Sequence, residues 1–169
     1  MSGVFFIADP HFGHKNIIDY ESRPFKSVEE MDNSLIKNWN NTVSKTDKIF
    51  ILGDFAFTGK QRVQELVSQL NGIKTLILGN HDRAHSMTWW KDVNFYEISQ
   101  YPIIYREWFI LSHEPVYLNQ NMPYANIFGH VHTHKNYVDY GKQGFCACVE
   151  RIGYKPISWD EIMDKMKVI

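Results

Sequence analysis

The chain has 169 residues, of which 44% are hydrophobic and 22% charged, with 18 Lys and Arg against 19 Asp and Glu. This length suits one domain spanning residues 1–169, and the composition excludes a disordered chain. The near-zero net charge disfavours binding along duplex nucleic acid, which requires a basic excess. The longest apolar run, Val4–Ala8, is far shorter than the about 20 residues of a membrane helix and follows no basic signal-peptide segment. We therefore expect a cytoplasmic protein that binds no membrane.

Short apolar runs alternate with longer amphipathic segments in the first half, which predicts an α/β fold. Buried strands are predicted at Val4–Ala8, Ile49–Leu52 and Thr75–Leu78. Between the first two, Ser27 and Glu30 form a capping box in front of a helix with one apolar face. Thr58 is expected to cap a second helix, which ends at Gly72.

The second half contains shorter elements. Two more buried strands are predicted at Trp108–Leu111 and Asn126–Phe128. The segments Phe95–Leu111 and Asn136–Val149 are rich in aromatic and β-branched residues and are predicted to form hairpins, the second turning at 141–144. Ser158 and Glu161 open a last helix. Hairpins without intervening helices indicate antiparallel pairing, so we expect mixed sheets.

Polar side chains follow each of the five predicted buried strands. In chain order, these blocks are Asp9 and His11; Gly53 and Asp54; Gly79, Asn80, His81 and Asp82; His113; and Gly129, His130 and His132. The carboxyl ends of strands in α/β sheets are where ligands bind. The spacing of two in Asp9-x-His11 and His130-x-His132 is expected to place both side chains on one side of an extended backbone, and Pro10 favours that conformation at Asp9.

The polar blocks supply seven nitrogen and oxygen donors: Asp9, His11, Asp54, Asn80, His113, His130 and His132. Seven are too many for one tetrahedral zinc ion and suit two divalent ions that share a carboxylate, for which Asp54 is the natural bridge. Without thiolates in the set, Mn²⁺, which we favour, and Fe, Zn²⁺, Ni²⁺ or Co²⁺ all fit. The four charges of two such ions exceed those of two carboxylates, so the site would attract a phosphate.

His81 and Asp82 remain without a metal, which makes His81 a candidate proton donor and Asp82 the acid that raises its pKa or orients it. His14 either contacts a substrate phosphate or caps its loop. Lys15 and Arg23 either supply charge to the substrate at the rim of the site or are solvated surface cations. The two cysteines, Cys146 and Cys148, are expected to be reduced structural thiols.

Taken singly, each predicted ligand has a plain structural explanation, because Asp and Asn often cap turns at strand ends. His113 is the least supported, since its context Ser-His-Glu-Pro is short and its assignment rests on chain order. Together, however, the five ordered blocks resemble the signature of the calcineurin-like metallophosphoesterase family, between residues 9 and 132. The opening Phe-Phe-Ile-Ala-Asp-Pro-His-Phe-Gly-His-Lys-Asn and the late Tyr-Lys-Pro-Ile-Ser at 154–158 resemble small bacterial and phage members.

The resemblance implies a four-layer α-β-β-α sandwich of two mixed sheets, with a dinuclear metal site at the carboxyl edge of the strands. One metal would be bound by Asp9, His11, Asp54 and His132, and the other by Asp54, Asn80, His113 and His130. It also implies that a hydroxide bridging the metals attacks phosphorus in line. His81 would meet the leaving-group oxygen or a phosphate oxygen, with Asp82 behind it.

These features predict a metal-dependent phosphohydrolase, and we favour a phosphodiesterase because the chain has no spare segment for a lid over the site. A small phosphoester, such as a cyclic or short linear nucleotide, suits the neutral charge. A phosphomonoesterase or a nucleotide pyrophosphatase is the alternative within the class. A non-catalytic interaction scaffold of the same fold is the alternative outside it, but such a protein would be expected to lack His81 or several ligands, and none is missing.

Overall fold

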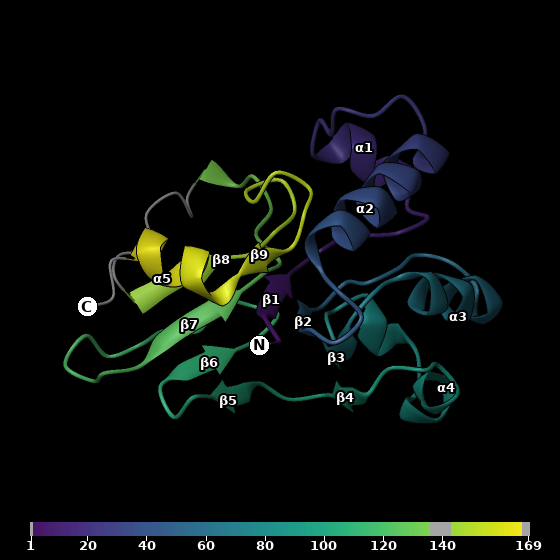
Figure 1. Ribbon diagram of the computed structural model, residues 1–169. Coiled ribbons are helices and arrows are strands. Elements are labelled where there is room, and N and C mark those ends of the chain that lie inside the picture. The colour runs from purple at the N-terminus through teal and green to yellow at the C-terminus, as the bar shows by residue number, and fades with distance from the viewer. Residues whose placement is uncertain (1, 136–142, 167–169) are drawn as a thin grey trace.

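Two β-sheets pack face to face in the computed structural model, which describes residues 2–135 and 143–166 (Figure 1). The first sheet contains, in spatial order, β4 (Glu97–Ser99), β3 (Ile73–Ile77), β2 (Lys48–Leu52), β1 (Val4–Ile7) and β9 (Ile157–Ser158). The second contains β5 (Ile103–Tyr105), β6 (Phe109–Leu111), β7 (Ala125–Phe128) and β8 (Gly144–Cys146). Strands β1 to β4 are parallel and β9 is antiparallel to β1. Because β5 is antiparallel to β6 while β6, β7 and β8 are parallel, both sheets are mixed, as predicted.

Helices α2 (Val28–Thr42) and α3 (Lys60–Gln69) lie on the side of the first sheet that faces away from the second sheet (Figure 1). Helix α5 (Trp159–Met166) lies beside β8 and β9, while α1 (Asn16–Tyr20) and α4 (Met87–Lys91) are single short turns. The arrangement is the sandwich of mixed sheets and helices that the sequence predicts. None of the helices in the described part of the chain is long and apolar enough to cross a membrane.

The helix signals of the sequence are largely confirmed. The Ser27 hydroxyl accepts a hydrogen bond from the Glu30 amide at the start of α2. At α5 the capping box is reciprocal, since the Ser158 amide donates to the Glu161 carboxylate and the Glu161 amide donates to the Ser158 hydroxyl. The predicted cap at Thr58 is wrong. Gly59 occupies the N-cap of α3, and no side chain accepts a hydrogen bond there.

Aromatic side chains fill the space between the sheets. Phe6 of β1 stacks on Phe50 of β2, with ring centroids 5.5 Å apart, and both meet Tyr105 of β5 edge-on. Trp159 at the start of α5 packs edge-on against Phe109 of β6, with centroids 4.6 Å apart. Such aromatic pairs each contribute about 0.5–1.5 kcal/mol beyond the area that they bury. This cluster therefore fixes the two sheets relative to each other and aligns their edges.

The predicted hairpin at Phe95–Leu111 is only partly correct. Its first strand, β4, pairs in parallel with β3 in the first sheet, and the antiparallel hairpin consists of β5 and β6 alone. The chain leaves one sheet after β4 and enters the other at β5, a crossing that the aromatic pattern does not reveal. The predicted hairpin at Asn136–Val149 falls partly on residues 136–142, outside the described residues, and β8 pairs in parallel with β7.

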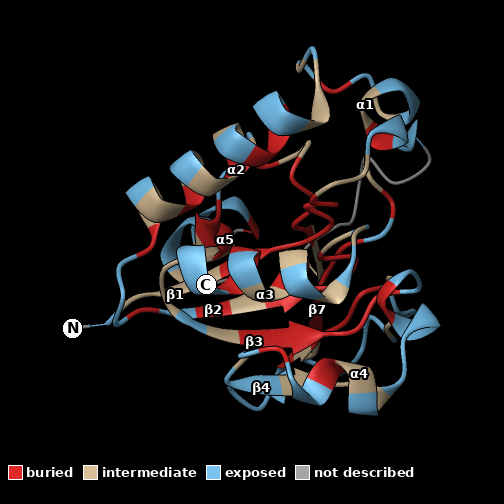
Figure 2. Cartoon of the chain, turned by 90° about the vertical axis from the view of Figure 1, so that its right-hand side faces the viewer, coloured by how far each residue is buried: buried red, intermediate tan, exposed pale blue. Residues whose placement is uncertain are grey.

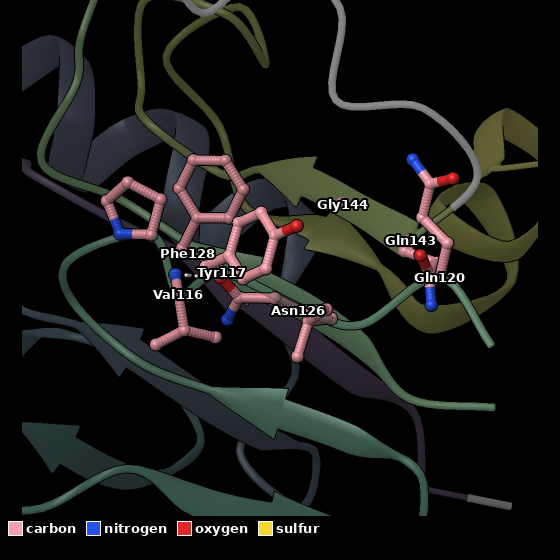
Figure 3. A pocket seen from close by; sticks show the side chains of 9 residues that line it. Val116, Tyr117, Gln120, Asn126, Phe128, Gln143 and Gly144 are labelled. Atoms are coloured by element: carbon pink, nitrogen blue, oxygen red, sulfur yellow. Dashed lines mark hydrogen bonds between the residues drawn. The ribbon is translucent and has the colours of Figure 1, made fainter. Parts of the chain in front are cut away.

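A buried amide fastens the loop after β6 to the second sheet. Asn126 of β7 is 2% exposed, and its Oδ1 accepts a hydrogen bond from the Val116 amide (Figure 3). Its Nδ2 donates to Ile110 O and Ser112 Oγ. We expect Asn126→Ala to lower the free energy of unfolding by about 1–3 kcal/mol, because it leaves these groups unpaired. Urea denaturation measures this loss. Asn33→Ala, at an exposed position of α2, is the control and should change stability by less than about 0.5 kcal/mol.

Candidate metal centre

The polar blocks after β1, β2, β3, β6 and β7 meet at one edge of the molecule, because the parallel strands that precede them end there. Figure 2 shows that the segments following the strand arrows are largely buried. Asp9, Asp54 and His113 are all nearly inaccessible to solvent. At the same edge Ala8 pairs with Cys148, so the end of β1 joins the continuation of β8. The donors therefore come together from both sheets.

A first group of donors comprises Asp9, His11, Asp54 and His132. The Nε2 atom of His11 lies 3.8 Å from Asp9 Oδ1 and 3.6 Å from Asp54 Oδ2. His132 Nε2 lies 3.6 Å from the same Asp9 oxygen. Asp9 Oδ1 and His11 Nε2 are buried without a hydrogen-bond partner among the described residues, which is costly for polar atoms. A cation between these atoms would satisfy them, so this group fits a divalent metal ion.

A second group comprises Asn80, His113 and His130, with Asp54 beside it. Asn80 Oδ1 lies 2.9 Å from His113 Nε2 and 3.0 Å from His130 Nδ1, and the two histidine nitrogens are 3.1 Å apart. Two ligands about 2.1 Å from one ion and at right angles to each other would be about 3.0 Å apart. His113 Nδ1 lies 2.9 Å from the Leu52 carbonyl, to which it donates, so its Nε2 keeps a lone pair for a metal.

Asp54 lies between the two groups. Its Oδ2 is 3.6 Å from His11 Nε2 and 3.5 Å from His113 Nε2, one nitrogen from each group. Its Oδ1 accepts a hydrogen bond from the His81 amide. This approach requires glycine at position 79, because a Cβ atom there would lie 2.1 Å from Asp54 Oδ1. Glycine at position 129 is needed for the same reason, since its Cβ would lie 2.3 Å from Asp9 Oδ2.

The backbone is left-handed rather than extended at five of the seven predicted ligands. Positive φ angles occur at Asp9 (56°), His11 (52°), Asp54 (51°), His130 (70°) and His132 (43°). Such a conformation costs a residue with a side chain about 1–3 kcal/mol and is concentrated at functional sites. The expectation of an extended backbone in Asp9-x-His11 and His130-x-His132 is therefore wrong. The chain turns sharply at each of these five residues, and the turns direct side chains from different strands toward one another.

Burial controls the protonation of the first group. It raises the pKa of the Asp9 carboxyl well above its usual value and lowers the pKa of His11. Burial also acts to lower the pKa of His132, but its hydrogen bond to Glu150 and the charge of Asp9 outweigh this effect and raise the pKa to about 9. Metal binding requires ionised Asp9 and neutral histidines. A bound cation would supply the positive charge that stabilises Asp9 in its ionised form.

Two buried charged residues outside the predicted ligand set support this group. Glu150 Oε1 accepts a hydrogen bond from His132 Nδ1 at 3.1 Å and from Arg23 Nε at 2.9 Å. Arg23 also donates to the carbonyl oxygens of Asp9 and Pro10, each at 2.9 Å. Arg23 is only 4% exposed, so of its two expected roles the solvated surface cation is wrong.

Glu150 is absent from the residues predicted from sequence. It directly follows the apolar run that ends at Val149, the same placement after a strand that identifies Asp9 and Asp54. That placement is the signal that could have found it. A carboxylate that accepts the second ring N–H of a metal-binding histidine fixes the tautomer and raises the basicity of the ligand.

We expect Glu150→Gln to weaken metal binding by about 10- to 100-fold, because His132 would lose the charged partner that orients it. Titration of metal-free protein with Mn²⁺ in competition with a chelating dye measures this loss. Glu65→Gln, at an exposed position of α3, is the matched control. Equal affinities for the two variants would contradict a positioning role of Glu150.

His81 and Asp82 occupy different environments. The His81 side chain is 43% exposed, and its Nε2 lies 3.9 Å from Asp54 Oδ2, so it borders the metal centre and reaches solvent. Asp82 is buried, and its carboxylate accepts hydrogen bonds from the amides of Phe55 and Gly79. Burial raises the pKa of Asp82 to about 7. Through these two hydrogen bonds to backbone amides, Asp82 ties together the loops after β2 and β3.

The remaining predicted residues differ in how they relate to the first group. His14 Nδ1 is 3.2 Å from His11 Nδ1, and the His14 ring stacks on Phe57 with centroids 4.4 Å apart. Lys15 is exposed at the start of α1. Cys146 and Cys148 are buried thiols, and Cys148 Sγ lies 3.3 Å from Asp9 Oδ2.

Known proteins resemble the whole chain or about half of it. The family model of the calcineurin-like phosphoesterases matches residues 3–165. An uncharacterized protein of Methanocaldococcus jannaschii is 34% identical over 180 residues, covering 100% of this chain and 96% of that protein. The gene 66 protein of Mycobacterium phage L5 is 40% identical over 90 residues, covering 52% of this chain and 43% of that protein. The crystal structure of a protein of unknown function from Aquifex aeolicus superposes with a TM-score of 0.73 at 28% identity, covering 98% of this chain and 100% of that one.

Proposed function

Because the chain belongs to the calcineurin-like phosphoesterase family, which hydrolyses phosphoesters with bound divalent metal ions, we propose that it is a dinuclear phosphodiesterase. The observation that carries this proposal is the position of Asp54, whose Oδ2 lies 3.5–3.6 Å from one histidine nitrogen of each donor group. A carboxylate in that position suits a ligand shared by two ions. We further propose that residues 1–169 act as one domain, which the family match over residues 3–165 supports.

In this proposal two sets of side chains hold the ions. Asp9, His11, Asp54 and His132 bind one metal, and Asp54, Asn80, His113 and His130 bind the other. Mn²⁺ is our first candidate, because it accepts mixed nitrogen and oxygen ligands; Fe, Zn²⁺, Ni²⁺ and Co²⁺ share that property. When bound, the pair of ions polarises the phosphate oxygens and supplies a water-derived nucleophile near neutral pH.

His81 then carries the proton chemistry of the chain itself. Its imidazole borders Asp54 and remains open to solvent, where it can donate a proton to the departing oxygen of the substrate. Asp82 is a positioning residue, because it holds the backbone of the loop that bears Asn80 and His81 against the loop that bears Asp54. Arg23 and Glu150 have the corresponding role for Asp9 and His132.

The exposure of the site supports a diester as substrate. With 43% of the His81 side chain exposed, a phosphate beside it has room for a substituent in addition to the leaving group. A small diester such as a cyclic or short linear nucleotide meets this condition. It also agrees with the net charge of −1, which offers no general attraction for a long polyanion.

Hydrolysis of bis-p-nitrophenyl phosphate by chelator-stripped protein, with and without added Mn²⁺, tests the proposal, with p-nitrophenyl phosphate measured in parallel. We expect Mn²⁺ to restore cleavage and the diester to be preferred. A preference for the monoester would keep the metal chemistry but overturn the substrate class. Absence of cleavage by folded protein that is shown to bind two ions would contradict hydrolysis and favour an interaction scaffold.

A further inference from the structure

A cavity of about 390 Å³ opens beside the metal centre and includes His81 in its wall. It is lined by Ala56, Phe57, Thr58, His81, Ala84 and His85. Its volume lies in the range of about 300–1,000 Å³ that is typical of small-molecule sites. The hollow on the second sheet in Figure 3 is smaller, about 200 Å³, and its lining includes none of the candidate ligands or His81. The cavity at His81 is therefore well placed to receive part of a substrate.

The wall of this cavity carries an exposed aromatic ring at Phe57, which is 50% accessible to solvent. The backbone amide of Phe57 donates a hydrogen bond to the Phe12 carbonyl at 2.7 Å. This bond fixes the backbone from which the Phe57 side chain extends. Its ring stacks on His14 at an interplanar angle of 18° and meets His81 edge-on, with centroids 5.4 Å apart. A half-exposed ring that is held rigidly in a cavity is suited to stacking against a second ring.

The rest of the wall consists of small or aromatic side chains and the hydroxyl-bearing Thr58. Ala56 and Ala84 contribute methyl groups, and the His85 ring lies parallel to Trp89, with centroids 4.1 Å apart and an interplanar angle of 7°. No Asp, Glu, Lys or Arg is among the residues that line the cavity. The chemistry of the wall thus favours a flat, weakly polar group over a charged one, in contrast to the metal centre next to it.

We propose that this cavity binds a planar aromatic ring on the leaving group of the substrate, with Phe57 as its stacking surface. The inference rests on the proposed function, because His81 belongs both to the cavity wall and to the border of the metal centre. A group seated in the cavity is then joined to the phosphate through the oxygen that His81 protonates. Phosphoesters of nucleosides or aryl alcohols are preferred over alkyl phosphoesters, and Phe57 determines the preference.

Three phosphonates that cannot be hydrolysed at the carbon–phosphorus bond test this inference with Mn²⁺-loaded protein: methylphosphonate, phenylphosphonate and the analogue of adenosine 5′-monophosphate with CH₂ in place of the ester oxygen. Calorimetric titration measures their affinities. We expect the ring-bearing ligands to bind at least about 5-fold more tightly than methylphosphonate. Phe57→Ala should abolish that gain and Phe57→Tyr should keep it. A gain confined to the adenosine analogue supports the proposal and identifies the ring as a nucleobase.

Tyr96→Ala is the matched control, since Tyr96 is an exposed aromatic residue just before β4, at the opposite end of the strands from the metal centre. It should leave all three affinities unchanged. The cavity proposal would be overturned if the wild-type protein bound all three ligands with equal affinity. It would also be overturned if Phe57→Ala still bound the ring-bearing ligands as much more tightly than methylphosphonate as the wild type does. If bis-p-nitrophenyl phosphate is still cleaved, either result leaves the proposed function intact. Absence of binding by all three, together with absence of diester cleavage, would overturn the proposed function and this inference with it.

Discussion

The Asp54→Ala variant is expected to lose metal binding and hydrolysis together, with a decrease in kcat/KM of at least about 10³-fold. Asp54 Oδ2 lies between the two donor groups, 3.6 Å from His11 Nε2 and 3.5 Å from His113 Nε2, so its removal takes a ligand from both sites at once. Metal ions contribute several kcal/mol of transition-state stabilisation, and each 1.36 kcal/mol corresponds to a factor of ten in rate. Elemental analysis of the purified variant and hydrolysis of bis-p-nitrophenyl phosphate measure the two losses.

Asp164→Ala, which removes an exposed carboxylate from α5, is the matched control and should retain both ions and full activity. Because Asp54 Oδ1 also accepts the His81 amide, circular dichroism of the variant must show a folded protein. If folded Asp54→Ala kept two ions per chain, the assignment of Asp54 as the shared ligand would be wrong. If it kept one ion, Asp54 would belong to a single site.

The second large effect is expected for His81→Ala, which should keep both metals and reduce kcat by about 10²- to 10⁴-fold, the usual contribution of a general acid. The side chain borders Asp54 at 3.9 Å but is 43% exposed, as suits a group that meets the substrate rather than a metal. The loss should be smallest for a diester with a p-nitrophenolate leaving group and largest for one with an alkoxide. A weakly basic leaving group departs without a proton, whereas an alkoxide needs one.

His134→Ala, which removes an exposed imidazole from the loop after β7, serves as the control and should be active on both substrates. Metal content that fell in His81→Ala as far as in Asp54→Ala would show that His81 is a ligand. A loss of equal size for both leaving groups would place His81 on a phosphate oxygen instead of the departing one. The two variants therefore separate metal binding from proton transfer.

Local patterns in the sequence were sufficient to predict most of the strands and helices. They were also sufficient to predict which polar side chains the fold brings together. Short apolar runs indicate the buried strands. The Ser27 and Ser158 caps lie within one turn of the helices that they begin. The donors that follow the strands converge because parallel strands end at the same edge, a consequence of topology that needs no side-chain detail. Asn80, His113 and His130, which come from two different sheets, meet within 3.1 Å as a result.

What the sequence did not reveal depends on contacts between distant segments. Arg23 and Glu150 are 127 residues apart in the chain, and the burial that makes them a structural pair exists only after the two sheets have joined. The role of Asp82 in fastening two loops is equally a product of the packed structure. The path of the chain from β4 to β5 is also set by packing, since a switch between sheets leaves no periodic signal in either strand.

Five donor residues have a left-handed backbone. We therefore expect the local stability of the loops that carry them to depend on the metal ions bound there. A conformation that each of these residues would otherwise avoid persists only where the surrounding contacts favour it, and an ion bound by its side chain would add to those contacts. Ions that bind only the folded chain stabilise it according to their free concentration relative to their Kd. The melting temperature should therefore fall on treatment with a chelator and return with Mn²⁺. Amide hydrogen exchange in the metal-free state should accelerate first in the loops after β1, β2 and β7, so that the working edge of the enzyme unfolds locally while the aromatic layer between the sheets stays closed.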